Sequence, residues 1–242
     1  MKPSNGVGIE ENCCVCRWRK GRDAFSLCNL SGEALQRLQQ ITALRVYDAG
    51  SVLYREEQVP AGIFILCNGR AKISISSRRG SVVILKVAEA GETLGLEAFF
   101  ANKPHEETAV LLDSCQVKFI PAEELRMFLV QHGEASLRAA HQLGTNCRSA
   151  RAQIRRIGLS VSGRERLVRL LITWANPERR KQAQETIVSA PFTHQEIAQM
   201  VGSSRETITR ALNSLKRKDV LEIRNRTLIV KNVDELERLA DQ

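Results

Sequence analysis

Residues 192–230 read FTHQEIAQMVGSSRETITRALNSLKRKDVLEIRNRTLIV, and the first half of this stretch predicts two short helices separated by a tight turn. Thr193 with Glu196, and Ser203 with Glu206, have the spacing of a capping box, in which side chain and backbone at a helix start bond each other reciprocally. The glycine between the two boxes suits a sharp turn, because glycine readily adopts positive φ. The stretch therefore predicts a helix-turn-helix.

The second predicted helix has two different faces. Its apolar residues recur at i, i+4 and i+7 and are expected to pack on the first helix: Ile208, Leu212 and Leu215 against Ile197, Ala198 and Val201. Its polar residues fall in one exposed row: Arg205, Glu206, Thr209, Arg210 and Asn213. Arginine near the start of such a helix can donate two hydrogen bonds to guanine, and glutamate can accept one from cytosine. The row therefore predicts base reading in a DNA major groove.

The end of the stretch predicts a two-stranded wing. VLEIRNRTLIVKN alternates between apolar and polar residues on both sides of Asn225-Arg226. Arg224 and Arg226 are suited to phosphate contact rather than base reading. We add Ser204, Thr193 and Gln195, at the two helix starts, to the candidate DNA contacts.

The charge of the chain is concentrated in its C-terminal part. Of the formal net charge of +9 over 242 residues, residues 1–133 hold 16 Lys and Arg against 15 Asp and Glu, whereas residues 134–242 hold 20 against 12. Such asymmetry indicates a polyanionic partner, since binding phosphates releases condensed counterions. No apolar run approaches the roughly 20 residues of a membrane span. We also find no export signal at the N-terminus, so we expect a cytoplasmic protein without a membrane partner.

The N-terminal half predicts a β-barrel or jelly roll behind a short helix over residues 31–41. From residue 44 to residue 121, short segments rich in Ile and Val are punctuated by glycines, which is typical of antiparallel strands. Asn68-Gly69 predicts a tight hairpin turn. In AKISIS, residues 71–76, we expect both isoleucines to face inward and both serines outward.

A long helix without proline is predicted from residue 135 to residue 159, after a shorter one that begins near Pro121. It bears a narrow seam of apolar and small residues, interrupted by Arg151: Leu137, Ala140, Gly144, Cys147, Ile154 and Ile157. Such a seam favours pairing with the same helix of a second copy, and hence a homodimer. Packing on its own barrel is the alternative.

This order of elements, together with HQEIAQMVGSSRETITRAL, resembles the Crp/Fnr family of bacterial transcription regulators from about residue 28 onward. The resemblance implies an α+β fold with an N-terminal β-barrel or jelly roll of the cyclic-nucleotide-binding type, a long dimerisation helix and a C-terminal winged helix-turn-helix. We expect a cysteine-rich arm at 1–30, a sensory barrel domain at 31–132, the dimerisation helix at 133–160 and the DNA-binding domain at 161–242.

The resemblance also implies a function. In the cyclic-AMP-binding members an Arg-Glu-x-x-x-Arg set reads DNA, and that set falls on Arg205, Glu206 and Arg210. It implies that the chain binds double-stranded DNA at an inverted repeat with TGTGA half-sites and has RNA polymerase as a second partner. It also implies that the protein is a regulator and not an enzyme. The chain agrees with the last point, since it has no HExxH motif, no Gly-rich phosphate loop of the required form, and scattered histidines.

Residues 91–115, GETLGLEAFFANKPHEETAVLLDSC, resemble the family's phosphate-binding cassette, with Gly95, Glu97, Glu107 and Thr108 as effector-pocket candidates. Where nucleotide-binding members place an arginine, this chain has Glu106-Glu107, and two carboxylates repel a phosphate. The cassette therefore argues against cyclic AMP. Two alternatives remain: a cyclic-nucleotide-responsive regulator with an atypical pocket, and a DNA-binding protein without an effector.

The arm offers a second candidate sensor. The oxygen-sensing members of the family hold an iron–sulfur cluster with three cysteines from such an arm and one from the barrel, and cysteine thiolates are the usual cluster ligands. In this chain the family's barrel cysteine aligns near Lys118, three residues beyond Cys115 and on the other face of a strand. The candidate ligands are Cys13, Cys14, Cys16 and Cys28. A cluster, a zinc ion, thiol redox chemistry and no cofactor at all stay open.

Overall fold

The protein is represented by a computed structural model that describes residues 26–159, 162–175, 186–188, 192–224 and 227–240. The chain divides into two compact units, which we call the barrel unit (residues 1–75 and 86–148) and the C-terminal unit (residues 76–85 and 149–242). Each unit is described by itself. Within the described ranges, no helix has the length and apolar character needed to cross a membrane.

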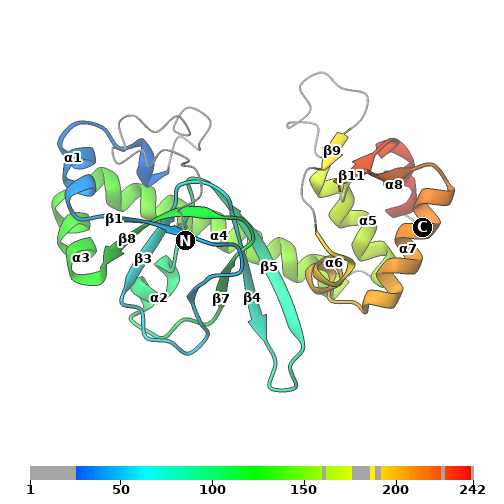
Figure 1. Cartoon of the computed structure of the whole chain (residues 1–242), viewed down its shortest axis with the longest axis horizontal. Coiled ribbons are helices and arrows are strands. Elements are labelled where there is room, and N and C mark those ends of the chain that lie inside the picture. Colours follow the sequence, from blue (N-terminus) through cyan, green and yellow to red (C-terminus); the bar gives the residue numbers. More distant parts are fainter. Residues whose placement is uncertain (1–25, 160–161, 176–185, 189–191, 225–226, 241–242) are drawn as a thin grey trace, which may run out of the picture. The chain divides into compact units, whose positions relative to one another are not determined.

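The barrel unit is built from two four-stranded sheets (Figure 1), which confirms the predicted fold of antiparallel strands in a barrel or jelly roll. One sheet has the order β1 (Ala43–Tyr47), β8 (Cys115–Pro121), β3 (Gly62–Leu66) and β6 (Thr93–Leu94). The other has the order β2 (Val52–Tyr54), β7 (Thr108–Leu111), β4 (Arg70–Ser76) and β5 (Val82–Glu89). The strands are short and rich in β-branched residues, which pack well on a pleated, half-buried surface.

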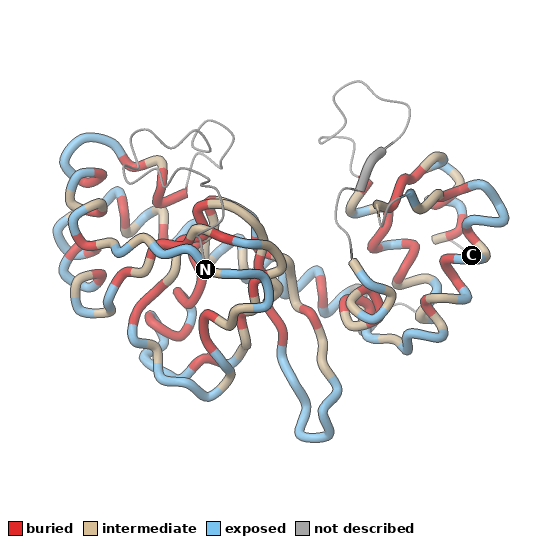
Figure 2. The backbone as a smooth tube through the Cα atoms, viewed as in Figure 1, coloured by how far each residue is buried: buried red, intermediate tan, exposed pale blue. Residues whose placement is uncertain are grey.

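Two apolar clusters of described residues pack within the barrel unit. Figure 2 shows the buried residues of its strands and helices in red. The first lies among strands of both sheets and includes Leu66, Ile73, Leu111 and Val117. The second joins β3 and β8 to four helices: α1 (Gly32–Gln40), α2 (Leu96–Ala101), α3 (Ala122–Gln131) and the first turns of α4 (Gly133–Leu159). It also takes in a 3₁₀ turn, η2 (Leu27–Asn29), so the chain is packed into the core from its first described residues.

The predicted alternation along β4 holds for Ile73 and fails two residues later. Ile73 is 1% exposed, but Ile75 is 37% exposed and Ser74 only 8%. The pairing of β4 with β7 ends at Ser74, which lies opposite Thr108. Ile75 therefore lies beyond the stretch of β4 that is paired with β7. The prediction that it faces the core is wrong.

The predicted hairpin at Asn68-Gly69 is also wrong. β3 and β4 belong to different sheets, so this turn carries the chain from one sheet to the other. Gly69 does have positive φ, at 74°. The Asn68 side chain accepts a hydrogen bond from the Gln116 amide at 2.7 Å. The asparagine thus fixes the turn to β8 instead of forming a primed hairpin turn.

Helix α4 has 27 residues and begins two residues before the predicted start. Most of its predicted seam is exposed in the single chain: Leu137 is 73% and Ile154 69% exposed, and Ala140, Gly144 and Cys147 are exposed as well. Ile157 differs, since it is partly buried and lies 3.7 Å from the position a Cβ would take on Gly202.

The described part of the C-terminal unit contains four further helices and a three-stranded sheet. The helices are α5 (Gly163–Trp174), α6 (His194–Val201), α7 (Arg205–Arg217) and α8 (Val233–Ala240). The predicted wing is confirmed as β10 (Leu221–Arg224) paired with β11 (Thr227–Val230), with Arg224 opposite Thr227. A third strand, β9 (Thr186–Val188), pairs with the other edge of β11 and has no counterpart in the sequence prediction.

Candidate nucleic-acid interface and barrel pocket

The start of α6 is the capping box that the sequence predicts. The Thr193 hydroxyl accepts a hydrogen bond from the Glu196 amide at 3.2 Å, and the Glu196 carboxylate accepts one from the Thr193 amide at 2.9 Å. The helix ends at Val201, and Gly202, the C-cap that follows it, has a φ of 61° in the left-handed region. Such a residue stops one helix and redirects the chain within a single position.

The start of α7 lies one residue later than predicted. Ser204, not Ser203, is the N-cap, and its hydroxyl accepts a hydrogen bond from the Thr207 amide at 3.2 Å. Ser203 instead completes the end of α6, since its amide donates to the Ala198 carbonyl at 3.0 Å. Its side chain packs on α5, because a Cβ on Gly163 would come within 2.3 Å of the Ser203 hydroxyl. The expected Ser203–Glu206 capping box is therefore wrong, although the turn itself is present.

The two faces of α7 are confirmed by burial. Ile208, Leu212 and Leu215 are completely buried, and so are Ala198 and Val201 of α6 with Ile197 at 1% exposed. Arg205, Glu206, Arg210 and Asn213 are exposed. Thr209 is the exception in the predicted polar row, because it is half-buried and its hydroxyl shares a hydrogen bond of 3.0 Å with Nδ1 of His194.

The exposed face of α7 combines positive charge with one acidic group. Hydrogen bonds from its own backbone amide and from Ser204 lower the pKa of Glu206, with the cations Arg205 and Arg210 adding to the effect. Burial lowers the pKa of His194, and the nearby cations Lys216 and Arg205 lower it further. Arginines that flank an ionised glutamate at a helix start can donate to guanine while the glutamate accepts from cytosine.

The remaining DNA-contact candidates lie beside this helix or outside the described residues. Gln195 is exposed on the first turn of α6, whereas Thr193 and Ser204 use their hydroxyls as helix caps. Arg224, at the end of β10, is ion-paired with Glu222, with Nη2 2.9 Å from Oε2. Arg226 lies outside the described residues. A phosphate at Arg224 would have to compete with the Glu222 carboxylate.

The barrel unit has a cavity of about 170 Å³ beside α2. Of the predicted pocket residues, Gly95, Glu97 and Glu107 line it, together with Lys103, His105 and Glu106. Thr108 is not among the lining residues, and its hydroxyl accepts a hydrogen bond from the Glu56 amide at 3.1 Å. The cavity wall thus carries three carboxylates, and all three belong to the segment 91–115 that resembles a phosphate-binding cassette.

A buried tyrosine, which the sequence analysis missed, holds one of these carboxylates. The Tyr54 hydroxyl donates a hydrogen bond of 2.9 Å to Oε1 of Glu107, and Tyr54 is 2% exposed. Burial raises the pKa of Glu107, and the negative charge of Glu97 raises it further. Burial, followed by the Glu107 charge, likewise raises the pKa of Tyr54. An added anion would meet like charge in a poorly solvated place.

Helix α4 is connected to this pocket through a polar network. The Asn146 amide group donates to Oε1 of Glu97. The Lys86 ammonium donates to Oδ1 of Asn146 at 2.7 Å and to Glu92 at 2.6 Å. No signal in the sequence connects these residues, since Lys86 and Asn146 are sixty positions apart and only the fold brings them together.

The arm cysteines Cys13, Cys14 and Cys16 lie outside the described residues. Cys28 is 1% exposed within the apolar cluster of the helices, and the Ser26 hydroxyl anchors this segment by donating to the Gly91 carbonyl at 2.6 Å. Cys67 and Cys115 are buried in the barrel, Cys147 is exposed on α4, and burial raises the pKa of Cys115. In the part of the chain that the structure describes, no three His, Cys, Asp or Glu residues form a metal-binding group.

Comparison with known proteins gives matches to both units. A cyclic nucleotide-binding domain matches residues 44–132, and a Crp-like helix-turn-helix domain matches residues 165–239. The anaerobic regulatory protein of Bacillus subtilis is 22% identical over 196 residues, covering 80% of this chain and 82% of that protein. The cAMP-activated global transcriptional regulator CRP of Haemophilus influenzae is 24% identical over 190 residues, covering 77% and 83%.

Solved structures share the fold. A mutant of CooA from Carboxydothermus hydrogenoformans aligns with a TM-score of 0.73 and 21% identity, covering 87% of this chain and 92% of that one. The two domain matches and the matches along most of the chain agree with the order of elements seen in the two units.

Proposed function

The chain belongs to the Crp/Fnr family of DNA-binding transcription regulators, which are not enzymes. From this premise we propose that it forms a homodimer and binds an inverted repeat with TGTGA-like half-sites. We further propose that a signal at the barrel or at the cysteine arm controls this binding. RNA polymerase is the second partner that such a regulator acts on.

The observation that carries the DNA proposal is the exposed row on α7. Arg205, Glu206 and Arg210 are exposed on a helix whose other face is completely buried on α6. Exposed groups fixed on a rigid helix lose little freedom when they meet base edges, so they can discriminate between bases. The excess of 20 Lys and Arg over 12 Asp and Glu in residues 134–242 adds the sequence-independent attraction to phosphates.

The support for a homodimer is the stripe along α4. Two large aliphatic residues, Leu137 and Ile154, are exposed on the same helix as three small or uncharged exposed residues, Ala140, Gly144 and Cys147. Small residues let two helices approach closely, and large exposed ones are costly to leave in water. A second copy of α4 would cover both kinds of residue at once.

For the signal, the pocket argues against the phosphate of a cyclic nucleotide. The Haemophilus relative is named as cAMP-activated, but this chain places Glu97, Glu106 and Glu107 on the wall of its cavity. We therefore expect no binding of cyclic AMP, which titration calorimetry will check. Tight binding would favour the alternative of a nucleotide-responsive regulator with an atypical pocket.

The cysteine arm is the other candidate input, and the Bacillus relative is named as an anaerobic regulatory protein. Four thiolates are the usual ligands of an iron–sulfur cluster. Of the four candidate ligands only Cys28 lies within the described residues, where it is buried among apolar side chains. We therefore assign no step to a cluster, and anaerobic purification with iron analysis will decide whether one is bound.

The experiment that tests the DNA proposal compares two labelled duplexes of equal length and composition, one with the inverted TGTGA repeat and one with its bases shuffled. At a fixed salt concentration we expect the repeat to bind at least about a thousandfold more tightly. Equal affinity for the two duplexes would contradict sequence-specific reading. Affinity that does not respond to oxygen, reductant or small molecules would favour a DNA-binding protein without an effector.

A further inference from the structure

The cavity beside α2 is unusual in its charge. Among the side chains that line it, three are carboxylates, Glu97, Glu106 and Glu107, and Lys103 is the only ammonium. Glu97 and Glu107 approach from α2 and from the segment before β7, and burial followed by the Glu97 charge raises the pKa of Glu107. The wall therefore presents an excess of hydrogen-bond acceptors and negative charge.

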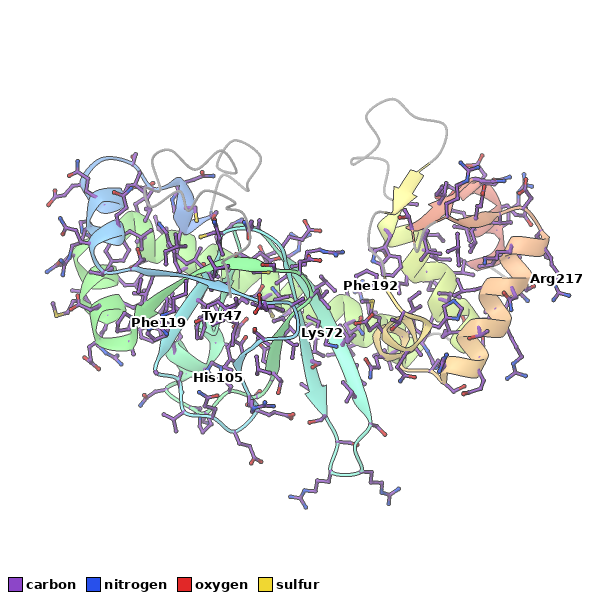
Figure 3. All side chains as sticks on the ribbon, in the orientation of Figure 1. Tyr47, Lys72, His105, Phe119, Phe192 and Arg217 are labelled. Carbon is purple, nitrogen blue, oxygen red and sulfur yellow. The ribbon has the colours of Figure 1, made fainter. Side chains whose placement is uncertain are left out.

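A second observation points to a ligand independently of the carboxylates. His105, labelled in Figure 3, also lines the cavity. It is 4% exposed, and its ring is stacked on that of Tyr54 at a centroid distance of 3.9 Å. Among the described residues, no hydrogen bond joins the ring nitrogens of His105 to another group, and neither nitrogen is among the completely buried atoms without a partner, so the ring is open to the cavity that it lines. Burial lowers the pKa of His105, so the ring is neutral and can accept a hydrogen bond.

From these groups we propose that the cavity binds a small organic cation with an ammonium or guanidinium head, held by Glu97 and Glu107 and facing His105. A positive N–H donor satisfies both carboxylates through charge-assisted hydrogen bonds. A metal ion fits less well, because within the described ranges no three His, Cys, Asp or Glu residues are grouped for one. This inference rests on the proposed function, because it takes the cavity to be the effector site of a DNA-binding regulator and names the chemical class of that effector.

A hydrogen bond connects the pocket to α4, so binding of a ligand in the pocket can affect that helix. Oε1 of Glu97 accepts the hydrogen bond from Asn146, and Asn146 in turn accepts one from Lys86. A cation that binds the Glu97 carboxylate competes for the oxygen that α4 now uses. Occupancy therefore alters a polar contact on the same helix whose exposed stripe we assign to the dimer.

Protons compete with such a cation for Glu107. The groups that face Glu107 are Tyr54 on β2, Glu97 on α2, Lys86 on β5 and its neighbour Glu106. Because its pKa is raised, Glu107 holds a proton at a higher pH than an ordinary glutamate, and the protonated form does not attract a cation. Cation affinity is therefore expected to increase with pH as Glu107 ionises.

Titration calorimetry on the full chain tests the proposal with agmatine, which has a guanidinium and an ammonium, with putrescine, and with cyclic AMP as an anionic probe. Glu97→Gln and Glu107→Gln remove one charge each and keep an acceptor for Asn146 or Tyr54. Glu123→Gln is the matched control, since Glu123 is exposed on α3 away from the cavity. We expect at least one cation to bind, and each pocket variant to weaken it about tenfold or more while the control does not.

Two results would overturn the inference: no binding of either cation up to about 10 mM, or affinities that are the same in Glu107→Gln, Glu97→Gln and the wild type. Circular dichroism and operator binding of each variant, measured without a cation, show whether it is folded. Operator binding also separates the two proposals. Binding of the operator without binding of a cation would support the proposed function and contradict the cation site. Binding of a cation without binding of DNA would support the cation site and contradict the proposed function.

Discussion

Nδ1 of His194 lies 3.0 Å from Oγ1 of Thr209, so the first turn of α6 is joined to the middle of α7 by a hydrogen bond. This contact lies beside the row that we assign to base reading, between Arg205 and Arg210 in the sequence. It orients α7 on α6 from the exposed side, while Ile208 and Leu212 do so from the buried side. Thr209 is therefore partly occupied by a structural contact, unlike the arginines around it.

The His194 contact predicts a pH dependence of stability. Burial and the cations Lys216 and Arg205 lower the pKa of His194 in the folded chain. As the pH falls through and below 6.5, the ordinary value, the unfolded state binds a proton that the folded state resists, so stability is lost. Urea unfolding at pH 7.5 and pH 5.5 should show a smaller acid loss in His194→Gln than in the wild type. Gln195→Ala, which removes an exposed side chain without a titratable group from the same helix, is the control and should lose as much as the wild type.

The cap of α7 predicts unequal effects of two neighbouring serines. Ser204 accepts the hydrogen bond from the Thr207 amide, so Ser204→Ala should lower the free energy of unfolding by about 1 kcal/mol. Ser203 does not cap the helix, and Ser203→Ala should change it by less than about 0.5 kcal/mol. Thermal or urea unfolding measures both variants. A larger loss for Ser203→Ala would restore the capping box that the sequence predicts.

Gly69 predicts a large cost for a single methyl group. Its φ is positive, and an added Cβ would lie 2.4 Å from Sγ of the buried Cys115. Gly69→Ala should therefore lower the free energy of unfolding by about 2–4 kcal/mol, from backbone strain and overpacking together. Gly80→Ala isolates the backbone part, because Gly80 has a similar φ of 80° and no other atom within 4 Å of its Cβ position. Equal losses in the two variants would mean that the Cys115 contact costs nothing.

The stripe on α4 predicts the effect of charge at its two largest residues. Leu137→Glu and Ile154→Glu place a carboxylate in the proposed helix pair and should weaken dimerisation about a hundredfold each, as seen by sedimentation equilibrium. Val59→Glu, which replaces an equally exposed valine between β2 and β3, should leave the dimer unchanged. A wild-type chain that stays monomeric, or a Leu137→Glu chain that stays dimeric, would contradict this assignment.

Periodicity predicts most elements of this fold, and the failures have local physical causes. Apolar residues that recur every three to four positions predict the helix at 31–41 and both helices of the helix-turn-helix. Apolar residues at every second position predict the strands from β1 to β8. Alternation fails at Ile75 because its neighbour β7 begins at Thr108, opposite Ser74, and so does not extend as far as Ile75. This depends on a partner strand more than thirty residues away in the sequence. Asn68-Gly69 has the composition of a hairpin, but strand order decides whether its flanking strands pair.

The two candidate sites differ in how far the sequence predicts them. The DNA-reading row is local, since one helix holds all its members and the helical period alone places them on one face. The barrel pocket depends on contacts between residues far apart in the sequence. Glu107, just before β7, accepts a hydrogen bond from Tyr54 on β2, and Glu97 on α2 accepts one from Asn146 on α4, which in turn accepts one from Lys86 on β5. The predicted members Glu97 and Glu107 came from the cassette region, and their partners carried no local signal.

The most direct test of the account is the base preference of the chain with and without Arg205. We expect the wild type to select an inverted repeat with TGTGA-like half-sites from randomised duplexes. Arg205→Ala should relax selection at one base pair of each half-site and weaken binding by about 1–3 kcal/mol. Arg224→Ala, on the wing, should weaken binding to all sequences alike. An unchanged base preference in Arg205→Ala would contradict the assignment of α7 as the reading helix.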